Sequence, residues 1–210
     1  MPQPVTPDIP DPTPYNGIDL LAYEPETATA QVVPATVVNI ASGTLGAWAN
    51  PTDARLVTGN GASHTSAGIG NSNFLQCAPA PAGTYDGIND GADITFMRVT
   101  FEIFTTRTGI YYPESYMMLM GSNAQYGVGQ QGTGNVEGAW LARSFDMPKS
   151  FYFPAGISGA QWKSGNFGPG FQIKNTDGAE AGTIQVRAVT MQIFYQNPIP
   201  DGGPGLLCEA

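Results

Sequence analysis

The amino-acid sequence predicts an all-β protein, a β-sandwich or jelly roll of about eight strands with an extended, proline-rich N-terminal arm and an extended C-terminal tail. Three observations predict it. Two long segments, Asp93–Thr106 and Thr183–Gln196, alternate apolar and polar residues. No stretch of ten or more residues keeps a helical period. The 27 glycines and 18 prolines supply many turns, and the prolines concentrate near the N-terminus.

Each long segment contains a change of phase. In the first, Ile94 and Phe96 share one phase, whereas Val99, Phe101 and Ile103 share the other. The second changes phase at Ala188 and Val189. A one-residue change of phase turns side chains to the opposite face unless a bulge absorbs it. We therefore expect a mid-strand irregularity in each segment, and neighbouring positions for the two strands in one strongly twisted sheet.

Shorter strands are predicted by β-branched and aromatic content. They cover 18–23, 31–40, Arg55–Thr58, Phe74–Cys77, Ser115–Met120, Phe151–Phe153 and Phe171–Lys174. Pro34 makes the segment 31–40 an edge strand or marks a break in it. One short helical turn is expected near Ala160–Lys163.

The chain divides into an arm (1–16), a sandwich domain (17–196) and an extended tail (197–210). Prolines recur through the arm, fixing φ and removing hydrogen-bond donors, so neither a helix nor a central strand can form there. Val5, Ile9 and Tyr15 are apolar anchors within it. They favour an arm that lies along a neighbouring subunit; the alternative is a solvated tail.

Charge and composition exclude several functions. The net charge is −9, and the eight basic residues are scattered, so no cluster exists to bind nucleic acid or an anionic membrane. Apolar runs are too short for a transmembrane helix, and no secretory signal is expected at the N-terminus. Charged residues make up only 12% of the chain, which suits packed contacts between proteins.

Catalytic constellations are sparse, so an enzyme is not expected. His64 is the single histidine and is expected in an exposed loop. A hydroxyl nucleophile needs a base held by a third group, and no such motif surrounds it. Asp86, Asn89, Asp90 and Asp93 could bind calcium, but turn formation explains the run better, and no metal or other cofactor is expected.

Aromatic residues and cysteines remain as candidates. Tyr111, Tyr112, Tyr126 and Trp140 lie in the loop-rich middle of the chain, where they would form surface contacts with sugars or proteins or would pack in the core. Cys77 and Cys208 are two free thiols, or they form a disulfide that pins the tail within the chain or across subunits.

A series of cues follows the chain from 45 to 196. The series is Trp48, Asn50, Pro51, Asp53, Ala54, Gly59, Ala62, Ser72, Leu75, Val99, Phe101, Ile103, Tyr116, Leu119, Trp162, Phe167, Gly168, Phe171, Ile173, Val189, Met191, Ile193 and Tyr195. In this order it resembles a β-sandwich module of virion proteins in tailed bacteriophages, found in capsid-decoration, collar and tail-fibre contexts. The resemblance implies a virion location, no catalytic residues, and other virion proteins as partners.

Two functions follow as expectations. The first is a capsid-decoration or neck/collar protein that clamps to neighbouring subunits through its arm, as a homo-oligomer. The alternative is a carbohydrate- or receptor-binding module of a tail fibre, with a host-surface glycan as its ligand.

Overall fold

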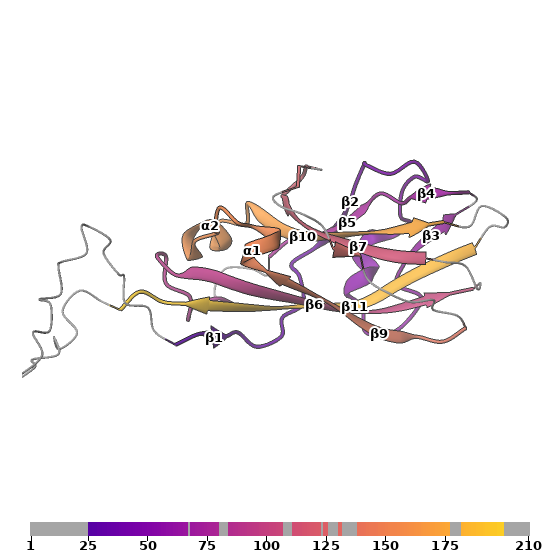
Figure 1. The fold of residues 1–210 in the computed structure, drawn as a ribbon. Helices are drawn as coiled ribbons and strands as arrows, with labels where there is room; N and C mark the ends of the chain where they lie inside the picture. The colour runs from indigo at the N-terminus through magenta and orange to yellow at the C-terminus, as the bar shows by residue number, and fades with distance from the viewer. Residues whose placement is uncertain are drawn as a thin grey trace, which may run out of the picture.

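A computed structural model describes residues 25–66, 68–79, 84–106, 111–122, 124–125, 130–131, 138–176 and 182–199. These residues form two antiparallel sheets packed face to face in an elongated sandwich (Figure 1). The predicted all-β class is confirmed, with eleven strands in the described ranges, of which three have only two residues each.

The first sheet is built around the two longest strands. Its order is β1 (Thr27–Ala28), β11 (Gly182–Gln196), β6 (Asp93–Thr105) and β9 (Leu141–Pro148), and β3 (Ala62–Ser66) also pairs with β11. The second sheet has the order β2 (Val37–Ile40), β5 (Phe74–Cys77), β10 (Phe167–Asn175), β7 (Tyr111–Leu119) and β8 (Gln130–Gln131), with β4 (Gly70–Asn71) also on β10.

The two predicted long strands are neighbours, and each contains the expected irregularity. In β11 the register passes from Arg187 opposite Glu102 to Thr190 opposite Thr100, so Ala188 and Val189 together lie opposite Phe101. Ala188 has a φ of 52° and its N–H donates to the carbonyl oxygen of Leu56 at 2.8 Å.

The irregularity in β6 lies earlier than the sequence pattern predicts. Ile94 is opposite Tyr195 and Phe96 is opposite Phe194, so Thr95 is the extra residue. Phe96 therefore does not share the buried face of Ile94, and Met97 takes the next buried position. The apolar character of Phe96 misled the prediction, because its ring packs edge-on against Phe194 outside the core.

Apolar side chains from both sheets fill the space between them. The rings of Phe101 on β6 and Phe171 on β10 stack with centroids 4.9 Å apart and an interplanar angle of 9°. Val99, Ile103 and Met191 are also fully buried or nearly so. Alternate residues of β6 and β11 face this core, so the intervening residues face away from it.

Two short predicted strands are wrong. The expected strand Arg55–Thr58 is replaced by a 3₁₀ helix, η1 (Pro51–Arg55), and bends, because Pro51 suits the first turn of a helix. Phe151–Phe153 falls on the helix α1 (Lys149–Tyr152) and its C-cap. Phe151 is exposed, whereas Tyr152 and Phe153 are both buried, which a strand with period two would not allow.

Two other local predictions are confirmed. The expected helical turn is α2 (Gly159–Lys163), which begins with a capping box between Ser158 and Gln161. Pro34 marks a break, because Val32 bridges to Met191 of the first sheet whereas Val37 pairs with Cys77 of the second.

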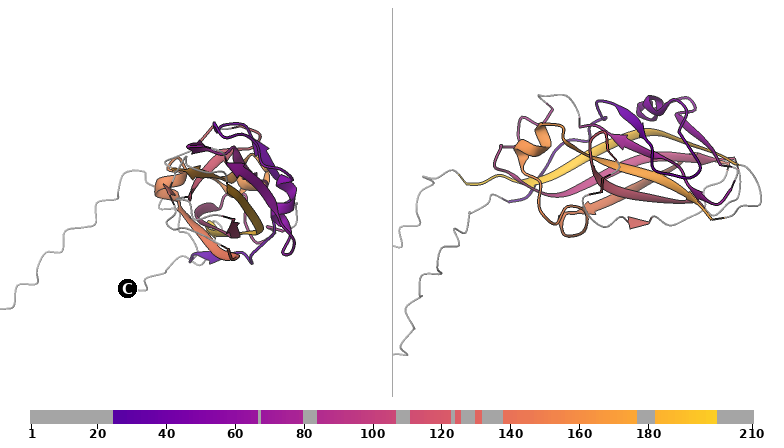
Figure 2. Two further views of the ribbon diagram at one scale, coloured as in Figure 1. Left: turned by 90° about the vertical axis from the view of Figure 1, so that its right-hand side faces the viewer. Right: turned by 90° about the horizontal axis from the view of Figure 1, so that it is seen from above.

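The described chain enters and leaves the sandwich at the same end. Thr27 is opposite Tyr195, and Gln196 is opposite Asp93. We call this end the base and define it as residues 25–28, 84–93, 149–164 and 194–199. The helices α1 and α2 lie there, as Figure 1 and the right-hand view of Figure 2 show. The arm (1–16), the expected strand 18–23 and the tail beyond residue 199 fall outside the described residues.

Candidate functional site

The outer face of the first sheet, turned away from the core, carries charged and aromatic side chains. Glu102 and Phe104 of β6 alternate with the buried residues Phe101, Ile103 and Thr105. Arg187 of β11 likewise alternates with buried Val186. The strand period therefore brings these residues to one surface.

One cluster on this outer face forms around Trp140. The guanidinium carbon of Arg187 lies 3.9 Å from the centroid of the Trp140 ring, and the Phe104 ring centroid lies 5.5 Å from that of Trp140. The Nε of Arg187 donates to Oε2 of Glu102 at 2.7 Å, and its Nη1 donates to the carbonyl oxygen of Gly59 at 3.0 Å. Arg187 thus holds the indole, a carboxylate and a loop in fixed positions.

A second cluster lies toward the base. The rings of Phe96 and Phe194 meet edge to face with centroids 4.9 Å apart, and the guanidinium of Arg98 lies 5.8 Å from the Phe96 centroid. Arg98 makes a two-point contact with Asp146 of β9, at 2.6 Å from Nε and 2.8 Å from Nη2.

The two clusters are far apart on a single strand. Phe96 and Phe104 are eight residues apart on β6, or about 27 Å at the rise of an extended strand. In both clusters an arginine lies over an aromatic ring and bonds a carboxylate. Aromatic residues and arginine are enriched in protein interfaces, so the outer face has the chemistry of a protein contact surface.

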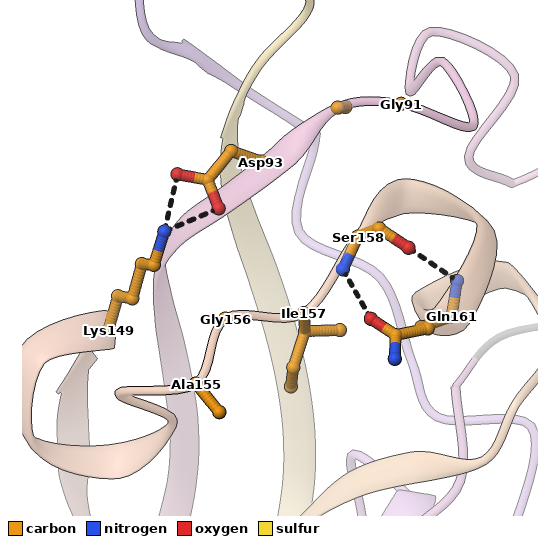
Figure 3. A pocket seen from close by; sticks show the side chains of 9 residues that line it. Gly91, Asp93, Lys149, Ala155, Gly156, Ile157, Ser158 and Gln161 are labelled. Atoms are coloured by element: carbon orange, nitrogen blue, oxygen red, sulfur yellow. Dashed lines mark hydrogen bonds and ion pairs between the residues drawn. The ribbon is translucent and has the colours of Figure 1, made fainter. Parts of the chain in front are cut away.

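A polar pocket of about 310 Å³ opens at the base between the start of β6 and the segment from α1 to α2 (Figure 3). Lys149 and Asp93 face each other on one side, with Nζ 2.7 Å from both carboxylate oxygens. Their side chains are 37% and 26% exposed, so the pair remains accessible to solvent.

The opposite wall and the floor of the pocket come from the turn before α2. Ser158 and Gln161 form the wall and bond one another through the capping box, at 2.8 Å and 3.2 Å. Ala155, Gly156 and Ile157 lie between the two sides. The pocket therefore combines a small apolar surface with one accessible ion pair.

Hydrogen bonds at the base fix the start of the C-terminal tail. The side-chain amide of Asn197 accepts from the N–H of Asn89 at 2.9 Å and donates to the carbonyl oxygen of Gly87 at 3.1 Å. Lys163 pairs with Asp90 and donates to the carbonyl oxygen of Ile88 at 3.0 Å. The loop 84–92 is thereby tied to both α2 and the tail.

The structure separates the predicted aromatic residues. Trp140 joins the outer face of the first sheet, where it is half-buried. Tyr111 and Tyr112 belong to β7 of the second sheet, opposite Asn175 and Lys174, and their side chains are outside the described set. Tyr126 and the arm residues Val5, Ile9 and Tyr15 lie outside the described residues as well. Their predicted contacts stay predictions.

The disulfide also stays a prediction. Cys77 is fully buried on β5 and forms no disulfide with a described residue, and burial raises the pKa of its thiol to about 12. Cys208 lies outside the described residues.

His64 is not an exposed loop residue, which corrects the expectation from the sequence. It lies on β3, is 3% exposed, and packs against Trp48 with ring centroids 5.4 Å apart. Its Nδ1 lies 3.2 Å from the carbonyl oxygen of Ala47, whereas Nε2 is buried without a hydrogen-bond partner among the described residues. Burial lowers the pKa of the imidazole, although the contact with Ala47 opposes this. The Gly–Ala–Ser–His–Thr–Ser sequence suggested a loop because its small and polar residues lack the apolar alternation that predicts a strand.

In the described ranges, no group of three or more His, Cys, Asp or Glu side chains gathers in a way that could hold a metal ion. Two carboxylates of the run that suggested calcium, Asp90 and Asp93, contact lysines. Among the described residues no helix is long and apolar enough to span a bilayer.

No protein-family model matches the sequence, and no curated protein matches it. Among solved structures, the chain is similar to the family 11 carbohydrate-binding module of the cellulase Lic26A-Cel5E of Clostridium thermocellum, at 12% identity and a TM-score of 0.40 over 79% of this chain and 95% of that one. It is similar to a carbohydrate-binding module designated CBM4, at 12% identity and a TM-score of 0.36 over 62% and 81% of the two chains. It is also similar to the coat protein of Tobacco streak virus, at 11% identity and a TM-score of 0.29 over 88% and 95%. Because every one of these TM-scores is below 0.5, they define neither a family nor a function. The assignment as a two-sheet β-sandwich rests on the strand pairing itself.

Proposed function

We propose that this chain is a structural protein of a bacteriophage virion, of the capsid-decoration or neck/collar type, which attaches to other virion proteins at its base. The virion assignment follows the resemblance of the series from Trp48 to Tyr195, and one observation carries the attachment at the base: the described chain enters and leaves the sandwich side by side, with Thr27 opposite Tyr195. The segments that precede and follow the sandwich in the sequence can therefore both bind the same neighbouring surface while the sandwich projects from it.

The composition supports attachment by packing. Only 12% of the residues are charged, and the proline-rich segment 1–16 loses less conformational entropy on docking than an ordinary segment. Asn197 bonds Asn89 and Gly87, so the tail starts from a fixed position. A fixed starting point also lowers the entropy lost when a terminal segment binds.

Deletion of residues 1–16 tests this function. We expect the truncated chain to be absent from assembled particles while the sandwich keeps its melting temperature. A control chain carries the same sixteen residues in scrambled order, which keeps length, proline content and charge, and it should also fail to assemble. Incorporation of the truncated chain at the level of the intact chain would contradict attachment through the arm.

A second function, glycan binding as in a tail-fibre module, is favoured by the outer-face cluster of Trp140, Phe104, Glu102 and Arg187. Aromatic rings stack on sugar rings, and charged groups bond hydroxyls. The guanidinium of Arg187 covers one face of the indole at 3.9 Å, which leaves less ring surface for a sugar. A glycan array tests this: binding that is lost in Trp140→Ala would favour the second function, and an array without signal would remove it.

A further inference from the structure

We propose that the base pocket of one molecule receives the proline-rich N-terminal segment, residues 1–16, of a second copy of this chain. The inference rests on the proposed function, in which this segment attaches the protein to a neighbour, and it names the surface that accepts it.

The pocket lies beside the place where the described chain begins at residue 25, and residues 17–24 connect this point to the segment 1–16. Thr27 is opposite Tyr195, and Asp93, which lines the pocket, is opposite Gln196. Two strand spacings separate β1 from β6, or about 10 Å. Where copies of this chain meet base to base or side by side, the chain that leads to the N-terminal segment of one copy therefore leaves the sandwich near the pocket of the next.

The chemistry of the pocket complements that of the segment. Residues 1–24 contain four carboxylates and no lysine or arginine, and Asp8 and Asp11 flank Ile9 and Pro10. The pocket offers the accessible ammonium of Lys149 beside the small apolar surface of Ala155. An ammonium has three donors, so Lys149 can bond Asp93 and an incoming carboxylate together.

The size of the pocket fits a short peptide segment. Its volume of about 310 Å³ is at the lower end of the range for ligand pockets, about 300–1,000 Å³. An extended proline-rich peptide loses little entropy on docking, because its backbone is already restricted.

The spacing favours a second copy over the segment's own pocket. Sixteen residues in the extended conformation expected from the prolines span about 50 Å. Residues 17–24 separate the segment from the described chain, and eight extended residues span about 26 Å. The molecule's own pocket is only about 10 Å from Thr27, so an extended chain would carry the segment past it and within reach of a neighbour.

Photo-crosslinking with the full-length chain tests the proposal. Ile9 is replaced by a photoreactive residue (Ile9→p-benzoylphenylalanine), and the protein is mixed in equal parts with the same variant labelled with ¹⁵N. After irradiation, mass spectrometry identifies the cross-linked peptides. We expect crosslinks to residues 149–161, and some of them should join an unlabelled chain to a ¹⁵N-labelled chain, which shows that they form between two molecules.

Two substitutions in the sandwich provide a matched comparison. Ala155→Glu places a carboxylate in the pocket, whereas Ala160→Glu places one on an exposed position of α2 that does not line it. Ala155→Glu should lower the crosslink yield about fivefold, as expected for one unfavourable charged contact, and Ala160→Glu should leave it unchanged. Asp8→Asn with Asp11→Asn should also lower the yield, without any change to the sandwich.

Crosslinks within single molecules only, crosslinks outside 149–161, or no crosslinks would each overturn the proposal. An equal yield from Ala155→Glu and Ala160→Glu would also overturn it. The crosslinking result can be distinguished from the result of deleting residues 1–16, which is measured by incorporation into particles. If residues 1–16 are needed for incorporation but crosslink elsewhere, the proposed function stands and the pocket is not the receiving surface.

Discussion

Replacement of Ala188 by glycine should stabilise the protein, which is unusual for a strand residue. Ala188 has a φ of 52°, in the left-handed region where a side chain with a Cβ costs about 1–2 kcal/mol. Glycine removes this cost but adds about 0.5–1 kcal/mol of unfolded-state entropy. We therefore expect Ala188→Gly to raise the free energy of unfolding by up to about 1.5 kcal/mol and the midpoint of thermal unfolding by up to about 3–6 °C.

Urea unfolding and calorimetry measure this change, with Ala142→Gly as the matched control. Ala142 is an exposed residue of the edge strand β9, and its φ is not positive. Glycine there should lower the free energy of unfolding by about 0.5–1 kcal/mol. If Ala188→Gly destabilises the protein as much as Ala142→Gly does, the left-handed bulge in β11 is refuted.

Three further predictions concern packing and ionisation. Gly159→Ala should lower the free energy of unfolding by about 3 kcal/mol in a urea titration, because its Cβ would lie 1.9 Å from the carbonyl oxygen of Asn89; Gly68→Ala, which has open space, should change little. Because burial lowers the pKa of His64, the unfolded chain binds a proton that the folded chain does not as the pH falls below about 6.5. The free energy of unfolding should then decrease as the pH is lowered, by at most about 1.4 kcal/mol per pH unit, and His64→Gln should remove this part of the pH dependence. An unchanged pH dependence in His64→Gln would contradict the burial of a neutral imidazole. With a thiol pKa of about 12, Cys77 should react with iodoacetamide at pH 8 only after unfolding, and fast labelling of Cys77 in the native protein would contradict its burial.

The parts of the fold that the sequence predicted are those where burial alternates strictly. β6 and β11 were recognised because their apolar residues face one core on a regular period. Their phase changes also predicted that the strands are irregular. The irregularity in β6 was predicted at the wrong residue because Phe96 is apolar, although its ring pairs with Phe194 outside the core.

The missed elements have polar or mixed sequences. β3 consists of Ala, Ser, His, Thr and Ser, and its pairing with β11 places His64 in the interior, which composition does not indicate. β9 was missed although Phe145 and Met147 are buried, because its first half, from exposed Leu141 to Ser144, does not alternate between apolar and polar residues. Tertiary pairing decided both strands.

The candidate site was predictable only in part. Trp140 was recognised as an aromatic contact residue, but its partners Arg187 and Phe104 come from strands distant in sequence. The base pocket could not be predicted from the sequence, because Asp93 and Lys149 are 56 residues apart and come together only in the folded structure. Residues brought together by strand register cannot be grouped from a single sequence.

Electron cryomicroscopy of the assembled particle tests the central claim most directly, because it shows which end of the sandwich faces the other virion proteins. The account predicts that the base, with Thr27 and Asn197, points toward the particle and that density continues from it into neighbouring subunits. A sandwich whose base points into solvent, with its opposite end bound to the particle, would contradict attachment through the terminal segments.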